Sequence, residues 1–179
     1  GLSNNDNTKI YNQLNNLFSR NILFIHKEEI QEVLNKYNII EEYSIKKIYP
    51  STINIRIKPT KFIARLSSND QLIGENGKLI EDRKNKDKLP YVFGKFNSKE
   101  FLSFRKNITQ SQFTFTEFKM LYFFPSNRWD ILTYNDILIK LPQGDIFKSL
   151  NLAHKIINMN NFNDKNIIDL RVKNHLIVK

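Results

Sequence analysis

Ile53, Ile55 and Ile57 alternate with polar residues, and this strict period of two constrains the fold more than any other feature of the sequence. Successive side chains of a β-strand point to opposite faces of its sheet, so this pattern predicts a strand with one buried face and one wetted face. Residues 43–49 predict a preceding strand, and residues 50–52 (Pro-Ser-Thr) predict the turn between the two.

Two amphipathic helices are expected before this pair of strands. Apolar residues recur at helical spacing over residues 8–18 and again over residues 27–37. The second helix would begin with Glu28 and Glu29, and acidic residues are favoured at the positive end of the helix dipole. The first section therefore has the order helix, helix, strand, strand.

The second section is richer in strands. Residues 62–66 continue in extended form, and the Asn-Gly pair within residues 74–77 predicts a hairpin turn. Ser98 and Asp145 are placed to cap two helices that run to about Ile108 and Met159. We expect further strands over residues 89–93, 112–115, 118–124, 129–133, 137–141, 167–172 and 175–178. Together these elements predict a mostly antiparallel sheet with two helices laid on it.

The expected fold class is therefore α+β, with two domains. A chain of 179 residues is long enough for two small domains, each with a modest core. We place the first domain at residues 1–68 and the second at residues 69–179, because the order of elements changes near that point.

Composition excludes several classes of protein. The chain has no cysteine, which excludes zinc fingers, iron–sulfur clusters, thiol catalysis and disulfides. No apolar run approaches the roughly 18 residues that a membrane-spanning helix needs. The net charge of +10 is spread out, with +4 up to Leu66 (10 − 6) and +6 after it (18 − 12), whereas a nucleic-acid-binding protein usually concentrates its positive charge. The one dense basic run, residues 83–88, is either a solvated loop or a contact for an acidic partner or anionic lipid headgroups.

No catalytic motif is recognisable. His26, His154 and His175 do not form an HExxH-type metal motif, and the sequence has no nucleophile elbow, P-loop or dinucleotide-binding glycine motif. We therefore expect no enzymatic activity, no cofactor and no metal. An active site assembled from residues distant in the sequence is the alternative.

A nucleic-acid-binding sheet is a second alternative, because the chain is basic and rich in aromatic residues. Six aromatic residues could form the stacking surface: Phe113, Phe115, Phe118, Tyr122, Phe123 and Phe124. Aromatic residues that alternate in a strand also occur as core residues, and no RNP-type motif is present.

Several segments resemble one known family. Residues 48–57 (IYPSTINIRI) are similar to the signature that crosses the last hairpin of POTRA domains in the FtsQ/DivIB family of bacterial cell-division proteins. Residues 128–141, with Asn-Asp at the turn, resemble a hairpin of that family's C-terminal β domain, and residues 168–171 (IDLR) resemble its "v-D-l-R" strand. Residues 89–94 (LPYVFG) are similar to its "LP-x-l-x-G" segment. The resemblance covers nearly the whole chain, in the right order.

One departure follows the POTRA hairpin. The family usually has Glu-Arg-x-Pro-x-Ala there, and this chain keeps only the alanine, Ala64. The glycine at position 1 resembles the residue that follows the family's first POTRA strand, so we expect that strand and the family's single membrane helix to lie upstream of this sequence.

The resemblance implies a role without catalysis. It implies a periplasmic domain of a single-pass inner-membrane protein at the division septum, which links division proteins and binds partners of the FtsB and FtsL type. A basic nucleic-acid-binding module, or a POTRA-containing accessory protein of membrane assembly or transport, is the alternative function.

The candidate partner-binding residues lie in the last two expected strands. A terminal strand often forms a sheet edge, to which a partner strand can add through main-chain hydrogen bonds. Arg171 and Lys173 would attract acidic partner residues. Replacing Ile177 with proline is expected to abolish partner binding and to leave the fold intact. The candidate residues are Ile168, Leu170, Arg171, Val172, Lys173, His175, Leu176, Ile177 and Val178. The alternative is that these strands are simply paired core strands.

Overall fold

A computed structural model describes residues 2–81, 87–159, 165–172 and 177–178. The chain divides into two compact units, each described here by itself. Unit 1 comprises Gly1–Lys61 with Gly74–Ile80, and unit 2 comprises Phe62–Ile73 with Glu81–Lys179. Within the described residues, no helix is both long enough and apolar enough to span a membrane.

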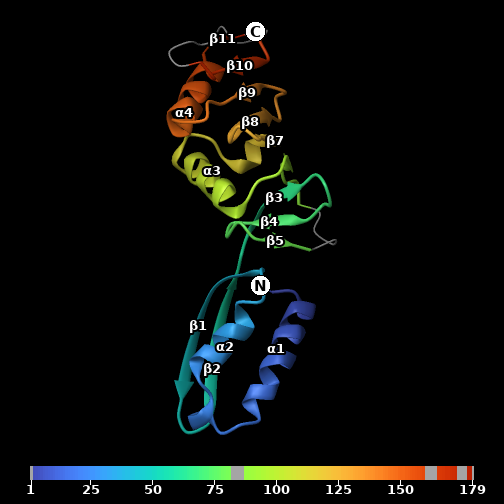
Figure 1. The fold of residues 1–179 in the computed structure, drawn as a ribbon, viewed down its shortest axis with the longest axis vertical. Coiled ribbons are helices and arrows are strands. Elements are labelled where there is room, and N and C mark those ends of the chain that lie inside the picture. Colours follow the sequence, from blue (N-terminus) through green and yellow to red (C-terminus); the bar gives the residue numbers. More distant parts are fainter. Residues whose placement is uncertain (1, 82–86, 160–164, 173–176, 179) are drawn as a thin grey trace. The chain divides into compact units, whose positions relative to one another are not determined.

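Unit 1 has the predicted order of two helices followed by two strands (Figure 1). The elements are α1 (Asn4–Phe18), the 3-10 helix η1 (Ile22–Phe24), α2 (Lys27–Leu34), β1 (Ile40–Ile48) and β2 (Thr52–Pro59). The strands pair antiparallel from Ile40 opposite Pro59 to Ile48 opposite Thr52. The predicted inward isoleucines of β2 pack against a core that contains Ile10 and Leu14 of α1 and Ile30 and Leu34 of α2. Both helices therefore cover the same face of this hairpin.

The predicted turn at Asn76-Gly77 is confirmed. Gly77 has a φ of 72°, in the left-handed region that glycine adopts without a steric cost. The Asn76 side-chain Nδ2 donates to the main-chain oxygens of Asn38, at 2.9 Å, and of Ile40, at 3.3 Å. These bonds explain why residues 74–80 group with unit 1 although they lie beyond its last long strand. A domain boundary at residue 68 stays a prediction.

Unit 2 contains a sheet and two helices, as predicted. Its elements are β3 (Phe62–Leu66), β4 (Leu72–Gly74), β6 (Tyr91–Phe93), α3 (Ser98–Gln110), η2 (Phe115–Glu117), β7 (Phe118–Phe124), β8 (Arg128–Thr133), β9 (Leu138–Lys140), α4 (Ile146–Ile157), β10 (Ile167–Asp169) and β11 (Ile177–Val178). The strand order is β11-β10-β9-β8-β7-β6-β3-β4. The short strand β5 (Leu79–Ile80) belongs to unit 1. The α+β class is confirmed. The pairs β3–β6, β6–β7 and β9–β10 are parallel, and β7–β8, β8–β9 and β10–β11 are antiparallel.

Both helices of unit 2 contribute to one core. Phe104 of α3 stacks on Trp129 of β8, with ring centroids 4.3 Å apart and planes 7° from parallel. Leu150 and Ala153 of α4 are fully buried in the same cluster as Leu121 of β7. One face of the sheet is therefore covered by helices, so the strand edges and the opposite face are the surfaces to consider for binding.

Three local predictions were wrong. Residues 112–115 do not form a strand, because Thr114 and Glu117 form a capping box that starts η2; the Thr114 N–H donates to Glu117 Oε1 at 2.7 Å. The cap of α3 is Asn97 rather than Ser98, since Asn97 Oδ1 accepts from the Glu100 N–H at 3.0 Å. Asp145 does precede α4, but its backbone is left-handed and its side chain makes no capping bond.

Candidate interaction edge of the C-terminal sheet

Among the described strands, β11 is the outermost at one end of the sheet, and β10 lies between it and β9 (Figure 1). β10 runs parallel to β9, with Ile168 opposite Ile139 and Asp169 opposite Lys140. β11 runs antiparallel to β10, with Ile177 opposite Asp169. The end of the sheet that the sequence suggested as a binding edge is therefore its outer strand.

The hydrogen bonds of β10 show which main-chain groups of β11 face outward. Leu138 N–H donates to the Asn166 carbonyl at 2.7 Å, and Leu170 N–H donates to the Lys140 carbonyl at 2.9 Å. Within a strand, residues that bond to one neighbour alternate with residues that face the other neighbour. Asp169 consequently faces β11, so the main-chain groups of Ile177 face back towards Asp169. The main-chain groups of Val178 point to the free edge.

The side chains of this edge divide between core and surface. Ile168 and Leu170 are buried in the main core of unit 2, and Val178 packs against it. Ile177 is 43% exposed and Val172 is 55% exposed. A strand that added to β11 would therefore find exposed apolar side chains beside the free main-chain groups.

Charged side chains flank the same edge. Arg171 Nε donates to both carboxylate oxygens of Asp169, at 2.8 and 3.0 Å. These hydrogen bonds lower the pKa of Asp169 below its ordinary value, and they raise that of Arg171. On β8, burial raises the pKa of Asp130, against the opposing effect of Arg128, whose Nε lies 3.2 Å from Asp130 Oδ1. Lys140 stands between the two carboxylates in register, opposite Asp130 and Asp169.

The predicted binding residues thus have different surroundings. Ile168 and Leu170 serve the core, Arg171 is engaged by Asp169, and Val172 and Ile177 are exposed. Lys173, His175 and Leu176 lie outside the described residues. Sequence reasoning missed Asp169 as the partner that offsets the charge of Arg171. Their spacing of two residues could have indicated it, because such residues share a face of an extended chain.

The histidines considered in the sequence as candidate metal ligands have other surroundings in the structure. The part of the chain that is described contains no cluster of histidine and acidic residues suited to a metal ion. The main-chain N–H of His26 donates to Glu29 Oε1 in the capping box at the start of α2, and the His154 ring packs edge-on against Phe113. His175 lies outside the described residues.

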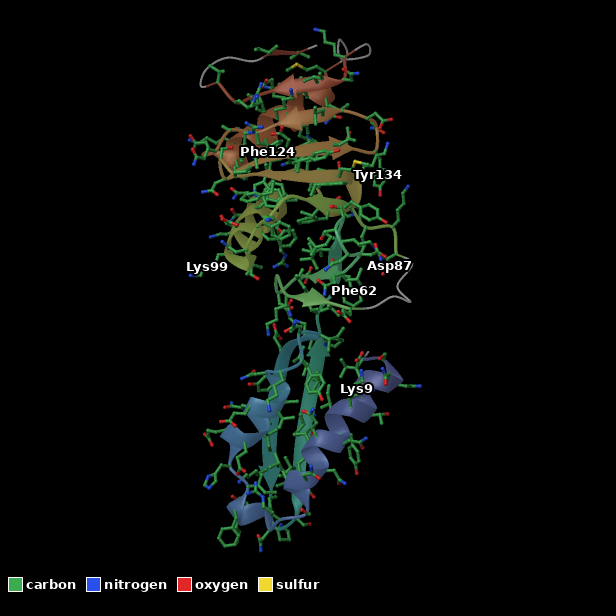
Figure 2. All side chains as sticks on the ribbon, turned by 45° about the vertical axis from the view of Figure 1, so that its right-hand side comes forward. Lys9, Phe62, Asp87, Lys99, Phe124 and Tyr134 are labelled. Carbon is green, nitrogen blue, oxygen red and sulfur yellow. The ribbon has the colours of Figure 1, made fainter. Side chains whose placement is uncertain are left out.

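The aromatic cluster proposed for nucleic acid does not form one surface. Phe113, Phe118 and Phe123 are buried in the core, Phe115 packs against it, and Tyr122 stacks on Phe93. Phe124, the sixth residue of the cluster, lies at the opposite end of the β7–β8 pair from Tyr134, a further aromatic residue (Figure 2). Each is covered by a cation of this chain: Arg128 lies 4.3 Å from the Phe124 ring centroid, and Lys88 lies 4.1 Å from that of Tyr134. These rings are therefore not free platforms for bases.

Comparison with known proteins agrees with the fold of each unit. Residues 1–58 match the family described as "POTRA domain, FtsQ-type". Residues 63–171, more than half of the chain, match "Cell division protein FtsQ/DivIB, C-terminal". The chain belongs to the FtsQ/DivIB family of cell-division proteins. The candidate edge includes the last strand within the second match, β10, and β11 beyond it.

A curated relative supports the same family. "Cell division protein FtsQ" of Rhizobium meliloti (strain 1021) is 23% identical over 158 residues, which are 85% of this chain and 51% of that protein. The chain thus spans about half the length of the relative that it matches. The family resemblance predicted from the sequence is confirmed, and with it a place among cell-division proteins.

Proposed function

We propose that the chain is the periplasmic part of an inner-membrane divisome scaffold, which binds other division proteins at the septum and catalyses no reaction. Membership of the FtsQ/DivIB family supports the cell-division role. The main observation that supports binding is the free edge of β11, where main-chain groups of Val178 face outward beside the exposed side chain of Ile177.

The proposed binding mode is strand addition. A partner segment of the FtsB or FtsL type would extend the sheet by pairing with β11, since an unpaired strand edge offers a row of donors and acceptors. Main-chain hydrogen bonds would supply affinity without regard to sequence. Selectivity would come from side chains that fit against Val172 and Ile177, which expose 55% and 43% of their surface.

Charge has a smaller part in this proposal than the sequence alone suggested. The Arg171 guanidinium is already paired with Asp169, so an acidic partner residue would have to compete with that carboxylate. Lys140, partly buried on the neighbouring strand, lies opposite the same carboxylate in register. Added salt should consequently weaken partner binding only modestly.

The direct test is calorimetric titration of this chain with the soluble ectodomain complex of FtsB and FtsL from the same organism. Saturable 1:1 binding that persists at physiological salt supports the scaffold function. Binding to nucleic acid that falls steeply with salt, without any binding to the division proteins, would instead favour the nucleic-acid-binding alternative.

A further inference from the structure

Unit 1 has an exposed apolar surface of its own. Its residues lie far along the sequence from β10 and β11. Leu23 and Phe24 of η1 are 62% and 69% exposed, the highest values among the large apolar side chains of the described residues. Ile48 and Tyr49, at the β1–β2 turn, are 44% and 60% exposed. These four residues are called the tip below.

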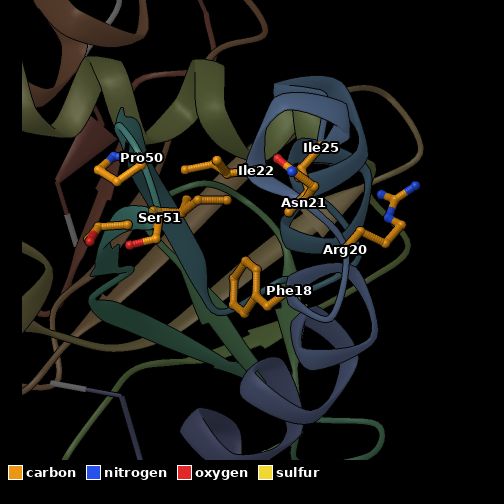
Figure 3. Close-up of a pocket in the computed structure, with 9 residues that line it drawn as sticks. Phe18, Arg20, Asn21, Ile22, Ile25, Pro50 and Ser51 are labelled. Carbon is orange, nitrogen blue, oxygen red and sulfur yellow. The ribbon is translucent and has the colours of Figure 1, made fainter.

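The two segments of the tip lie side by side. Lys47 Nζ donates to the Ile22 carbonyl at 3.2 Å, which joins the end of β1 to η1. Phe18, Ile22 and Ile25 line one pocket together with Pro50 and Ser51 of the turn (Figure 3). The exposed side chains therefore gather at one end of unit 1.

The local backbone holds these side chains outward. Ile22 and Ile25 are 6% and 2% exposed, so both sides of η1 are anchored in unit 1 while Leu23 and Phe24 between them are not. Asn21 Oδ1 accepts from the Leu23 N–H at 3.0 Å and caps the turn. The apolar tip is thus a preformed feature, since its exposure follows from a capped turn with two buried flanks.

Basic residues flank the tip in the sequence. The segments 20–29 and 46–53 contain four basic residues (Arg20, Lys27, Lys46 and Lys47) and two acidic residues (Glu28 and Glu29), a net charge of 4 − 2 = +2. Glu29 is already engaged, because Arg20 Nη2 pairs with it and the His26 N–H donates to it. Lys27 and Lys46 are exposed.

We propose that the tip inserts into the headgroup region of an anionic lipid bilayer. Aromatic and aliphatic side chains flanked by lysine and arginine are the composition of protein segments that lie in a membrane interface. The anionic surface of a bilayer attracts nearby basic residues and so complements the charge of this tip. Lipid binding by the tip would be an activity additional to the proposed scaffold function. The scaffold function enters only in identifying the membrane as the inner membrane.

A pair of tryptophan variants tests this proposal on the whole chain. Phe24→Trp places the reporter in the tip, and Tyr11→Trp places it at a residue of α1 that is 60% exposed. Trp129, the single native tryptophan, is 2% exposed and gives the same background in both variants. Each variant is mixed with vesicles of phosphatidylglycerol, or of phosphatidylcholine, that carry brominated acyl chains.

The expected result is quenching of the Phe24→Trp signal by phosphatidylglycerol vesicles, weaker quenching by phosphatidylcholine, and little quenching of the Tyr11→Trp signal. In vesicle flotation, Phe24→Ser combined with Tyr49→Ser should lower the bound fraction about tenfold at equal lipid. Equal quenching of both reporters, or none with phosphatidylglycerol, would overturn the proposal. Loss of binding to a division protein in the double variant, with flotation unchanged, would assign the tip to a protein partner and overturn it as well.

Discussion

Asp169 faces Ile177 across the β10–β11 pair, so the main-chain groups of Ile177 are directed into the sheet and those of Val178 are directed away from it. The backbones of these two adjacent residues therefore face opposite sides of β11. Ile177 holds β11 in the sheet through its backbone, although its side chain is exposed. Val178 packs its side chain on the core, while its main-chain groups face the free edge.

A proline at each position should therefore have a different effect on the free chain. Ile177→Pro removes the N–H directed at Asp169, so β11 should detach and the Asp169 amide should exchange with solvent about tenfold faster, as for the loss of one net hydrogen bond. Val178→Pro removes only an outward N–H and should leave that amide protected. Hydrogen exchange followed by NMR distinguishes them. Equal loss of protection in both variants would mean that the alternation is assigned to the wrong residues.

Asp130 and Asp169 should titrate in opposite directions from the ordinary aspartate pKa. Hydrogen bonds from Arg171 lower the pKa of Asp169, whereas burial raises that of Asp130. Asp169 therefore contributes stability above its unfolded pKa, and this contribution is lost as the pH falls through its folded pKa. Burial of the charged Asp130 carboxylate lowers the stability of the fold instead. This cost disappears as the pH falls below the raised pKa of Asp130 and the group becomes protonated. Carboxyl-carbon NMR titration measures both values directly.

Arg171→Gln is the variant that tests the cause of the Asp169 shift. The Asp169 pKa should move up towards its ordinary value, and the Asp130 pKa should rise slightly, because Arg171 also acts on it. An unchanged Asp169 pKa would show that the ion pair does not form in solution. The cost in stability should stay below about 1 kcal/mol, since the Arg171 side chain is 42% exposed.

The Phe104–Trp129 stack should be among the most sensitive points of unit 2. Phe104→Ala removes a side chain that is 1% exposed, and the free energy of unfolding should fall by about 3–5 kcal/mol. Phe147→Ala makes the same chemical change at a residue that is 39% exposed and should cost much less. Urea unfolding followed by circular dichroism compares the two. Similar losses in both would contradict the assigned core.

The two helix starts of unit 2 should respond differently to substitution. Asn97→Ala removes the capping bond to the Glu100 N–H and should destabilise by about 1 kcal/mol. Asp145 makes no such bond and has a φ of 50°, so Asp145→Gly relieves a left-handed backbone and should leave stability equal or slightly higher. A loss of stability at Asp145 as large as that at Asn97 would show that Asp145 does cap α4. Thermal unfolding of both variants provides the measurement.

Elements with a strong period were predictable from the sequence. The alternating isoleucines 53, 55 and 57 lie in β2 with their side chains on the helix-covered face, as expected. The spacing of apolar residues in α1 and α4 likewise gave the helices and their buried faces. These predictions depend on which face of a single helix or strand is apolar, and the local sequence pattern contains that information.

Other features depend on contacts that no local pattern contains. Residues 112–115 alternate as a strand would, but the Gln112 N–H donates to Asn151 Oδ1 of α4 at 3.1 Å, from 39 residues away, and the Thr114–Glu117 box then starts η2. The insertion of β6 between β3 and β7, which makes two pairs parallel, is equally non-local. At the proposed binding edge, the sequence suggested the strands but not which backbone groups face outward. The direction of these groups follows from the hydrogen bonds that Asn166 and Leu170 make with β9.

Partner addition at β11 is tested most directly by titrating three forms of the chain with the soluble FtsB–FtsL ectodomain complex in a calorimeter. We expect saturable binding to the unaltered chain, a modest loss of affinity for Ile177→Ser, which keeps the backbone, and loss of binding for Val178→Pro, which removes the outward N–H. Circular dichroism of the free variants verifies that each is folded. Undiminished binding by a folded Val178→Pro variant would contradict strand addition at this edge.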